Sequence, residues 1–416
     1  MLYQSNTIKG ATAMGAYDQL CNENRRKVDT LLSDTKANGG LAPLDVDQFW
    51  ADNEASRKDP FGGAIPQVPL GAICNWECIF DELGIEQDWQ RFLYDDPQWA
   101  LDISRKYNDE SERIVGRRLL PESLPDTERQ WPPIKMLHDV FEAENVWEGG
   151  KGGSWWLKQS AHSPEELASL LDRVERRLEN LRAFMLPDNW EAEKARLTGL
   201  GSAVPLYRGQ RGPCTFATSV YGAENLLLLN YDDPELFVRF SQMIGRSIIA
   251  IARVLDEEAG YTPETAPRGW GWADDNSCLF NTAAYETFAM PIHRAVFAVY
   301  APDPADRRYQ HSDSNMAHIL PQLGTLDLNG TNFGPTLTVA EIRRHLPHAV
   351  IDGQLAPFTF SRNEEANMVA EFLRDFDQAR DARGLNFTTA GSINNGSRLS
   401  GMRLLMAAIQ RYGRYE

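Results

Sequence analysis

A histidine and an aspartate stand two residues apart near the end of a predicted strand, in the stretch from Arg307 to Asn315. Strand residues two apart project to the same side, so His311 and Asp313 would face one pocket. An imidazole and a carboxylate placed in this way can exchange protons or share a divalent metal ion such as zinc. Asp313 could instead cap the helix predicted for 315–322.

Two further aspartates, Asp274 and Asp275, follow the strand predicted for 266–272. With His311 they could act as general acid and base, because burial and neighbouring charges shift the pKa values of such groups. Glu77 or Asp274 could supply the additional carboxylate that a metal site at His311 and Asp313 needs. Paired carboxylates would also suit glycoside hydrolysis.

The elements that must position these residues alternate regularly between strand and helix. Eight short apolar runs read as strands, at 68–73, 131–137, 203–207, 266–272, 307–312, 325–329, 349–352 and 385–389. Helices are predicted between them, with the last at 397–412. Such alternation favours an α/β fold with a parallel sheet, and eight repeats favour a (β/α)8 TIM barrel. Residues 1–64 read as a mostly helical N-terminal extension and 65–416 as the barrel. An open doubly wound sheet is the alternative, but no G-x-G-x-x-G follows the first strand.

Residues at the C-terminal strand ends of a barrel converge on one pocket. This rule predicts a catalytic group of His311, Asp274, Asp275 and Asp313. It also predicts substrate-binding residues at nine further positions, which are Trp76, Glu77, Tyr207, Arg208, Trp270, Trp272, Asn329, Gln354 and Ser392. The tryptophans would form walls around a flat substrate, although tryptophan is more often a core residue.

The composition restricts the class of partner. The 416 residues carry a net charge of −17 without a long basic run, which excludes a nucleic-acid partner on electrostatic grounds. Five cysteines form no disulfide framework, and no apolar run reaches the roughly 20 residues that span a bilayer. We therefore expect a cytoplasmic protein with a small-molecule substrate and no membrane association. A homodimer is compatible with the sequence, which does not define the oligomeric state.

Several motifs together resemble the uroporphyrinogen decarboxylase superfamily, which includes corrinoid-related methyltransferases. They are Gly212-Pro213-Cys214-Thr215-Phe216-Ala217, Gly222-Ala223-Glu224, Ala273-Asp274-Asp275, Tyr285-Glu286-Thr287-Phe288, His311-Ser312-Asp313-Ser314-Asn315 and Tyr412-Gly413-Arg414-Tyr415. The resemblance implies a (β/α)8 barrel. The zinc methyltransferases carry His-x-Cys and a later cysteine, where this chain has His311, Asp313 and Ser392. Both thiolates are replaced, so the resemblance implies an oxygen-rich metal site or none. The decarboxylase's Arg-Gln-Ala-Gly-Arg stretch is absent.

The sequence thus leaves three hypotheses. The first is an enzyme that moves a methyl group from a small, flat, methoxylated compound to a corrinoid protein. The second is a decarboxylase or lyase acting on a small aromatic or cyclic acid, in which Arg208 holds the carboxylate and Asp274 or His311 delivers a proton. The third is a barrel that binds a ligand without turning it over.

Overall fold

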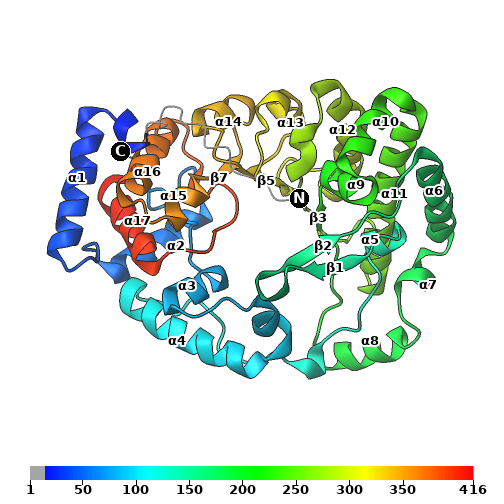
Figure 1. Cartoon of the computed structure of the whole chain (residues 1–416), viewed down its shortest axis with the longest axis horizontal. Coiled ribbons are helices and arrows are strands. Elements are labelled where there is room, and N and C mark those ends of the chain that lie inside the picture. Colours follow the sequence, from blue (N-terminus) through cyan, green and yellow to red (C-terminus); the bar gives the residue numbers. More distant parts are fainter. Residues whose placement is uncertain (1–14, 416) are drawn as a thin grey trace.

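The computed structural model describes residues 15–415. It has an α/β fold in which helices surround a parallel sheet (Figure 1). The sheet contains β3 (Gly209–Arg211), β4 (Trp270–Ala273), β5 (Arg308–Ser312), β6 (Gly330–Phe333), β7 (Val350–Leu355) and β8 (Leu385–Thr389). Each strand pairs in parallel with the next one along the chain, which is the strand order of a (β/α)8 barrel.

Helices connect these strands and cover the outer face of the sheet. They are α9 (Pro213–Tyr221), α10 (Ala223–Asp232), α11 (Pro234–Glu258), α12 (Thr282–Tyr300), α13 (Leu320–Gly324), α14 (Val339–His345), α15 (Pro357–Ser361), α16 (Glu365–Ala379) and α17 (Leu399–Tyr412). The longest, α11, begins where the Asp233 carboxylate accepts a hydrogen bond from the Leu236 N–H. Its buried residues recur at helical spacing, as Phe237, Ile244 and Ile248 show, so one apolar stripe packs against the core.

The first half of the described chain is mostly helical, and this helical region extends well beyond the one predicted for 1–64. It contains α1 (Asn22–Ala37), α2 (Val46–Lys58), α3 (Ile79–Leu83), α4 (Pro97–Val115), α5 (Leu137–Val140), α6 (Pro164–Glu179), α7 (Leu181–Met185) and α8 (Trp190–Gly199). Helix α1 packs against α16, and Tyr415 donates its N–H to the Pro66 carbonyl. The beginning and the end of the described chain therefore lie side by side (Figure 1).

Among the described residues the parallel sheet has six strands, where eight were predicted. Segment 68–73 forms no strand and joins β8 through an isolated parallel bridge between Leu70 and Phe387, with backbone hydrogen bonds from Gly71 and Ala72 to the Phe387 carbonyl. Segment 131–137 forms no strand, because Pro132 and Pro133 lack the N–H groups that a ladder requires. The strands predicted for 203–207 and 325–329 occur later in the chain, as β3 and β6.

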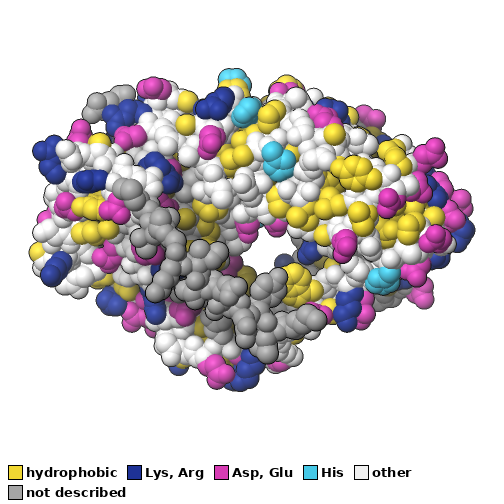
Figure 2. Space-filling view, turned by 45° about the horizontal axis from the view of Figure 1, so that its top comes forward, with side chains coloured by type: hydrophobic (Ala, Val, Ile, Leu, Met, Phe, Trp, Pro, Cys, Tyr) yellow, Lys and Arg dark blue, Asp and Glu magenta, His cyan; other side chains and the backbone are white. Residues whose placement is uncertain are grey.

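An antiparallel hairpin, β1 (Asn145–Glu148) with β2 (Ser154–Leu157), was not predicted. It borders the central opening on the side away from β5 and β7 (Figure 1). An opening is also visible in the space-filling view (Figure 2). No helix within residues 15–415 combines the length and the apolar character that crossing a bilayer requires.

Candidate functional site

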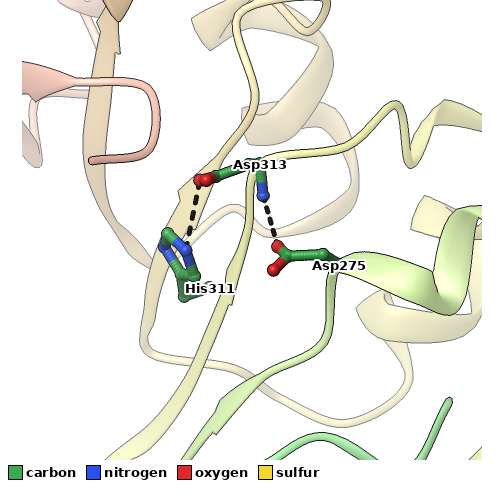
Figure 3. Close-up of side chains that lie close together, drawn as sticks. All are labelled: Asp275, His311 and Asp313. Carbon is green, nitrogen blue, oxygen red and sulfur yellow. Dashed lines mark hydrogen bonds and ion pairs between the residues drawn. The ribbon is translucent and has the colours of Figure 1, made fainter. Parts of the chain in front are cut away.

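Asp275, His311 and Asp313 meet at the C-terminal edge of the sheet (Figure 3). Each offers one ligand atom, and these atoms all lie within 4.8 Å of one another. His311 Nε2 lies 3.1 Å from Asp313 Oδ1, and the Asp313 N–H donates to Asp275 Oδ1 over 2.7 Å. The group therefore combines one imidazole nitrogen with two carboxylates.

Strand register explains why these residues meet. Ala273 on β4 pairs with His311 on β5, so Asp275 in the short helix Asp275–Leu279 lies just beyond the imidazole. Asp313 follows the last residue of β5 and turns back toward both groups. Parallel strands end on the same edge, which brings these residues together although up to 38 positions separate them in sequence.

Asn332 on β6 fixes the orientation of the His311 ring. Its Nδ2 donates to the Asp352 carbonyl over 2.6 Å and to the Thr389 carbonyl over 2.9 Å, which leaves Oδ1 as the acceptor. The Nδ1–H of His311 donates to that oxygen over 2.7 Å. The proton is thus held on Nδ1, and Nε2 is turned toward Asp313.

Two glycines allow Asp313 to occupy its position. A Cβ atom on Gly391, which has a φ of +108°, would lie 2.3 Å from Asp313 Oδ1. A Cβ atom on Gly334 would lie 2.3 Å from the Asp313 carbonyl oxygen. Both positions admit only glycine without displacing Asp313.

The charge of the site favours a protonated imidazole in the absence of an ion. The hydrogen bond to Asp313 raises the pKa of His311, against the opposing effect of partial burial. The His311 side chain is 24% exposed and the Asp313 side chain 50% exposed, so solvent and small molecules can reach both.

The residues fit a divalent metal ion. Imidazole and carboxylate ligands suit zinc and other first-row divalent ions. Ligating histidines usually donate their second ring N–H to a fixed acceptor, which here is the Asn332 amide oxygen. The sequence predicted His311 and Asp313 as metal ligands, and the structure adds Asp275 rather than Asp274 or Glu77.

Asp274 has a different role from the one expected. Its side chain is fully buried, and its Oδ1 accepts a hydrogen bond from the Thr215 N–H at the start of α9 over 2.7 Å. Burial raises the pKa of Asp274 to about 6. The carboxylate therefore satisfies a backbone N–H in the first turn of α9.

Trp270 and Trp272 lie on the outer face of the sheet. Trp270 packs against Tyr300, and Trp272 packs edge-on against His293, both on α12. Both tryptophans are almost completely buried. They are core residues and do not form walls of the site.

Tyr207 and Arg208 precede β3 and lie away from the triad. The guanidinium of Arg208 pairs with Asp256 and donates to the Pro267 carbonyl. The Tyr207 hydroxyl donates to Gln210, and its ring packs on Trp270. Arg208 is therefore not free to hold a substrate carboxylate.

Three further residues predicted to bind substrate lie in the second half of the chain. Asn329 lies at the start of β6, where it holds the loop before β5 through the Asp306 carbonyl. Gln354 donates to the carbonyls of Gly334 and Leu337. Ser392 is exposed in the loop after β8, next to Gly391.

Trp76 and Glu77 lie on a short helix (Trp76–Cys78) after segment 68–73. Trp76 is 38% exposed and lines a cavity of about 340 Å³ with Phe92 and Tyr94. Burial raises the pKa of Glu77. Trp76 remains available to an apolar ligand.

Comparison with known proteins adds a fold relationship. The structure resembles a methyltransferase from Methanosarcina mazei, with a TM-score of 0.51 and 16% sequence identity over 86% of this chain and 98% of that chain. This likeness shows a shared fold. No protein-family model matches the sequence, and no curated protein matches it either.

Proposed function

We propose that this protein is a metal-assisted methyltransferase that takes the methyl group from a small methoxylated compound. The observation that carries the proposal is the group of Asp275, His311 and Asp313, whose ligand atoms share one small volume. The fold shared with the Methanosarcina mazei methyltransferase supports it, as does the resemblance of the motifs to the decarboxylase and methyltransferase superfamily.

In the reaction, the bond between the methyl carbon and its oxygen breaks, the carbon bonds to an acceptor nucleophile, and the oxygen takes a proton from a solvent water. A divalent ion would act as a Lewis acid on that oxygen. Asp275 and Asp313 would supply carboxylate ligands and His311 its Nε2. Asn332 keeps the proton of His311 on Nδ1, which leaves Nε2 free for the ion.

For the acceptor we propose a corrinoid protein, which the resemblance alone supports. Free cob(I)alamin can replace such a partner in an assay. A homodimer is likewise a proposal, which sedimentation analysis tests.

The test combines metal binding with turnover. Zinc and manganese binding are measured on the wild type, on His311→Ala and on His348→Ala, a control at an exposed position. We expect His311→Ala alone to lose stoichiometric binding, and also to lose demethylation of p-methoxybenzyl alcohol with cob(I)alamin. A wild type that binds neither ion would contradict the proposal.

A second candidate function is carbon dioxide release from a small aromatic or cyclic acid. It is favoured by the raised pKa of His311, because a protonated imidazole beside Asp313 can deliver a proton to carbon. Arg208 was expected to hold the carboxylate of this acid, but its guanidinium is paired with Asp256. Carbon dioxide release that persists with a strong chelator would favour this candidate.

A further inference from the structure

An arginine lies in the same row of the sheet as His311. The register pairs Arg211 on β3 with Ala273 on β4, and Ala273 with His311 on β5. Residues paired across parallel strands project to the same side of the sheet, so the Arg211 side chain starts on the side that carries His311. Two strand spacings of about 4.8 Å place the Cα atoms of Arg211 and His311 about 10 Å apart. One small molecule can therefore contact both side chains.

The row that contains Arg211 is open to solvent. The opposite side of the same strands is packed, because Gln210 pairs with Trp272, which is almost completely buried. Arg211 is instead exposed, and Ala273 and His311 are partly exposed. Ala273 contributes only a methyl group between the two longer side chains. A small molecule can therefore approach this row from the C-terminal edge of the sheet.

Among residues 15–415, no carboxylate pairs with the guanidinium of Arg211. Its Nη1 donates one hydrogen bond, to the Ser219 hydroxyl over 3.3 Å. The chain has 59 acidic and 42 basic residues, and Arg208, three residues earlier, is paired with Asp256. A guanidinium carries five N–H donors, so most donors of Arg211 remain available to a ligand.

A cavity of about 140 Å³ lies beside Arg211, at the edge of β3 that pairs with no other strand among the described residues. His138 on α5 and Asn145 on β1 add polar groups to its lining, and Leu157 and Phe216 add apolar surface. No described Asp or Glu lines the cavity. The hairpin and α5 lie beside β3 at the central opening (Figure 1). A guanidinium beside apolar walls, without a competing acid, suits the carboxylate end of an aromatic acid.

We propose that Arg211 binds the carboxylate of a small methoxylated aromatic acid, whose methoxy group faces the triad of Asp275, His311 and Asp313. This inference rests on the proposed function, because it names the class of substrate for that site. A guanidinium forms two parallel hydrogen bonds with a carboxylate, which fix the orientation of the acid as well as its position. The role expected of Arg208 thereby belongs to an arginine at the C-terminal end of β3.

The test compares p-methoxybenzoate with p-methoxybenzamide, which has nearly the same shape and no charge. Calorimetry on metal-free protein excludes binding of the carboxylate to a metal ion. We expect the wild type to bind p-methoxybenzoate at least about tenfold more tightly than p-methoxybenzamide, because charge-assisted hydrogen bonds are the stronger ones. Equal binding of the two probes by the wild type would overturn the inference, whether or not any variant folds.

The variants locate the preference. Arg211→Gln should abolish it, and Arg211→Lys, which keeps the charge, should retain part of it. His311→Ala should retain it in full, which excludes a protonated imidazole as the group that binds the carboxylate. Arg268→Ala is the matched control, because Arg268 is an exposed arginine before β4 that donates to the Val299 carbonyl. A preference that survives in Arg211→Gln, or that is lost in His311→Ala, would also overturn the inference.

Zinc binding by the same wild type tests the proposed function separately. Zinc binding without a preference for the acid would leave the metal site standing and remove the carboxylate site. A preference for the acid without zinc binding would contradict metal-assisted methyl transfer and leave carboxylate recognition by Arg211, as the second candidate function requires. The two failures are therefore distinguishable.

Discussion

His311 and Asn332 lie on adjacent parallel strands, and the 2.7 Å hydrogen bond between them decides which imidazole nitrogen can bind a ligand. The Asn332 amide cannot flip without losing its bonds to the carbonyls of Asp352 and Thr389. The backbone carbonyls on β7 and β8 therefore determine which nitrogen of the partly buried His311 ring carries the proton.

Replacement of Asn332 by alanine should weaken zinc binding about 10–100-fold, because the ring loses the acceptor that fixes its tautomer. The measurement is competition with a chelator of known affinity. Asn329→Ala is the matched control, since Asn329 precedes the opposite end of β6 and its side chain hydrogen-bonds to the loop before β5 and to the Arg308 N–H. Unchanged zinc affinity in Asn332→Ala would contradict the proposed role.

Replacement of Gly391 by alanine should displace Asp313, because the new Cβ atom would lie 2.3 Å from its Oδ1. We expect zinc affinity to fall at least about tenfold. The control is Gly260→Ala, where φ is +83° and the added Cβ atom would meet no other atom within 4 Å, so it reproduces only the backbone strain. Strain of about 1–3 kcal/mol should lower the stability of both variants, with affinity lost in Gly391→Ala alone.

Replacement of Glu371 by glutamine should change how stability depends on pH. Glu371 is 5% exposed, and burial raises its pKa to about 7 although it accepts hydrogen bonds from the Ala356 N–H and the Thr359 hydroxyl. Because the pKa of Glu371 in the folded state lies above the unfolded value of about 4.3, Glu371 contributes most to stability when the pH is below about 4.3. That contribution declines by about 4 kcal/mol as the pH rises to about 7, and it stays constant at higher pH.

Urea unfolding at several pH values between about 4.5 and 8 measures this decline. The wild type should lose stability over that range relative to Glu371→Gln. Glu365→Gln, at an exposed position on the same helix, should follow the wild type. A parallel course of the wild type and Glu371→Gln would show that the carboxyl is not protonated on folding.

Replacement of Arg208 by alanine should destabilise the fold without affecting ligand binding. It would leave Asp256, whose side chain is 7% exposed, without its partner, at a cost of about 3–5 kcal/mol. Arg239→Ala removes the exposed pair with Asp172 and should cost at most about 1 kcal/mol. Chemical denaturation compares the free energies of unfolding of the two variants. Calorimetry with benzoate should detect no binding that depends on Arg208.

The strands that bear His311 and Asn386 could be predicted closely, because apolar runs of strand length alternate with clear helical periods. The strand predicted for 385–389 coincides with β8, and the helix predicted for 397–412 differs from α17 by two residues at its start. Strand β6 was misplaced, since Leu326 and Leu328 are buried in a turn, while the strand itself has one large apolar residue, Phe333. That shift directed attention to Asn329 and hid Asn332.

The site was predictable in part. The spacing of His311 and Asp313 indicated a shared pocket, and the structure places these two side chains 3.1 Å apart. The sequence could not show that Asp275, and not Asp274, joins His311 and Asp313. Asp274 is instead bound to the Thr215 N–H at the start of α9, a contact between residues 59 positions apart. The importance of Gly391 could have been suspected because a glycine stands two residues after the end of the last strand, where a positive φ is common at a turn.

The pairing of the earliest helices with the latest ones has a consequence for synthesis on the ribosome. The Arg411 guanidinium binds Asp34 on α1, and Val68 donates its N–H to the Gly413 carbonyl. A nascent chain must therefore hold α1 without its main packing partner until α16 has emerged. Chaperones that shield apolar surface would act over that interval, and release of a product lacking α16 and α17 should lead to degradation or aggregation.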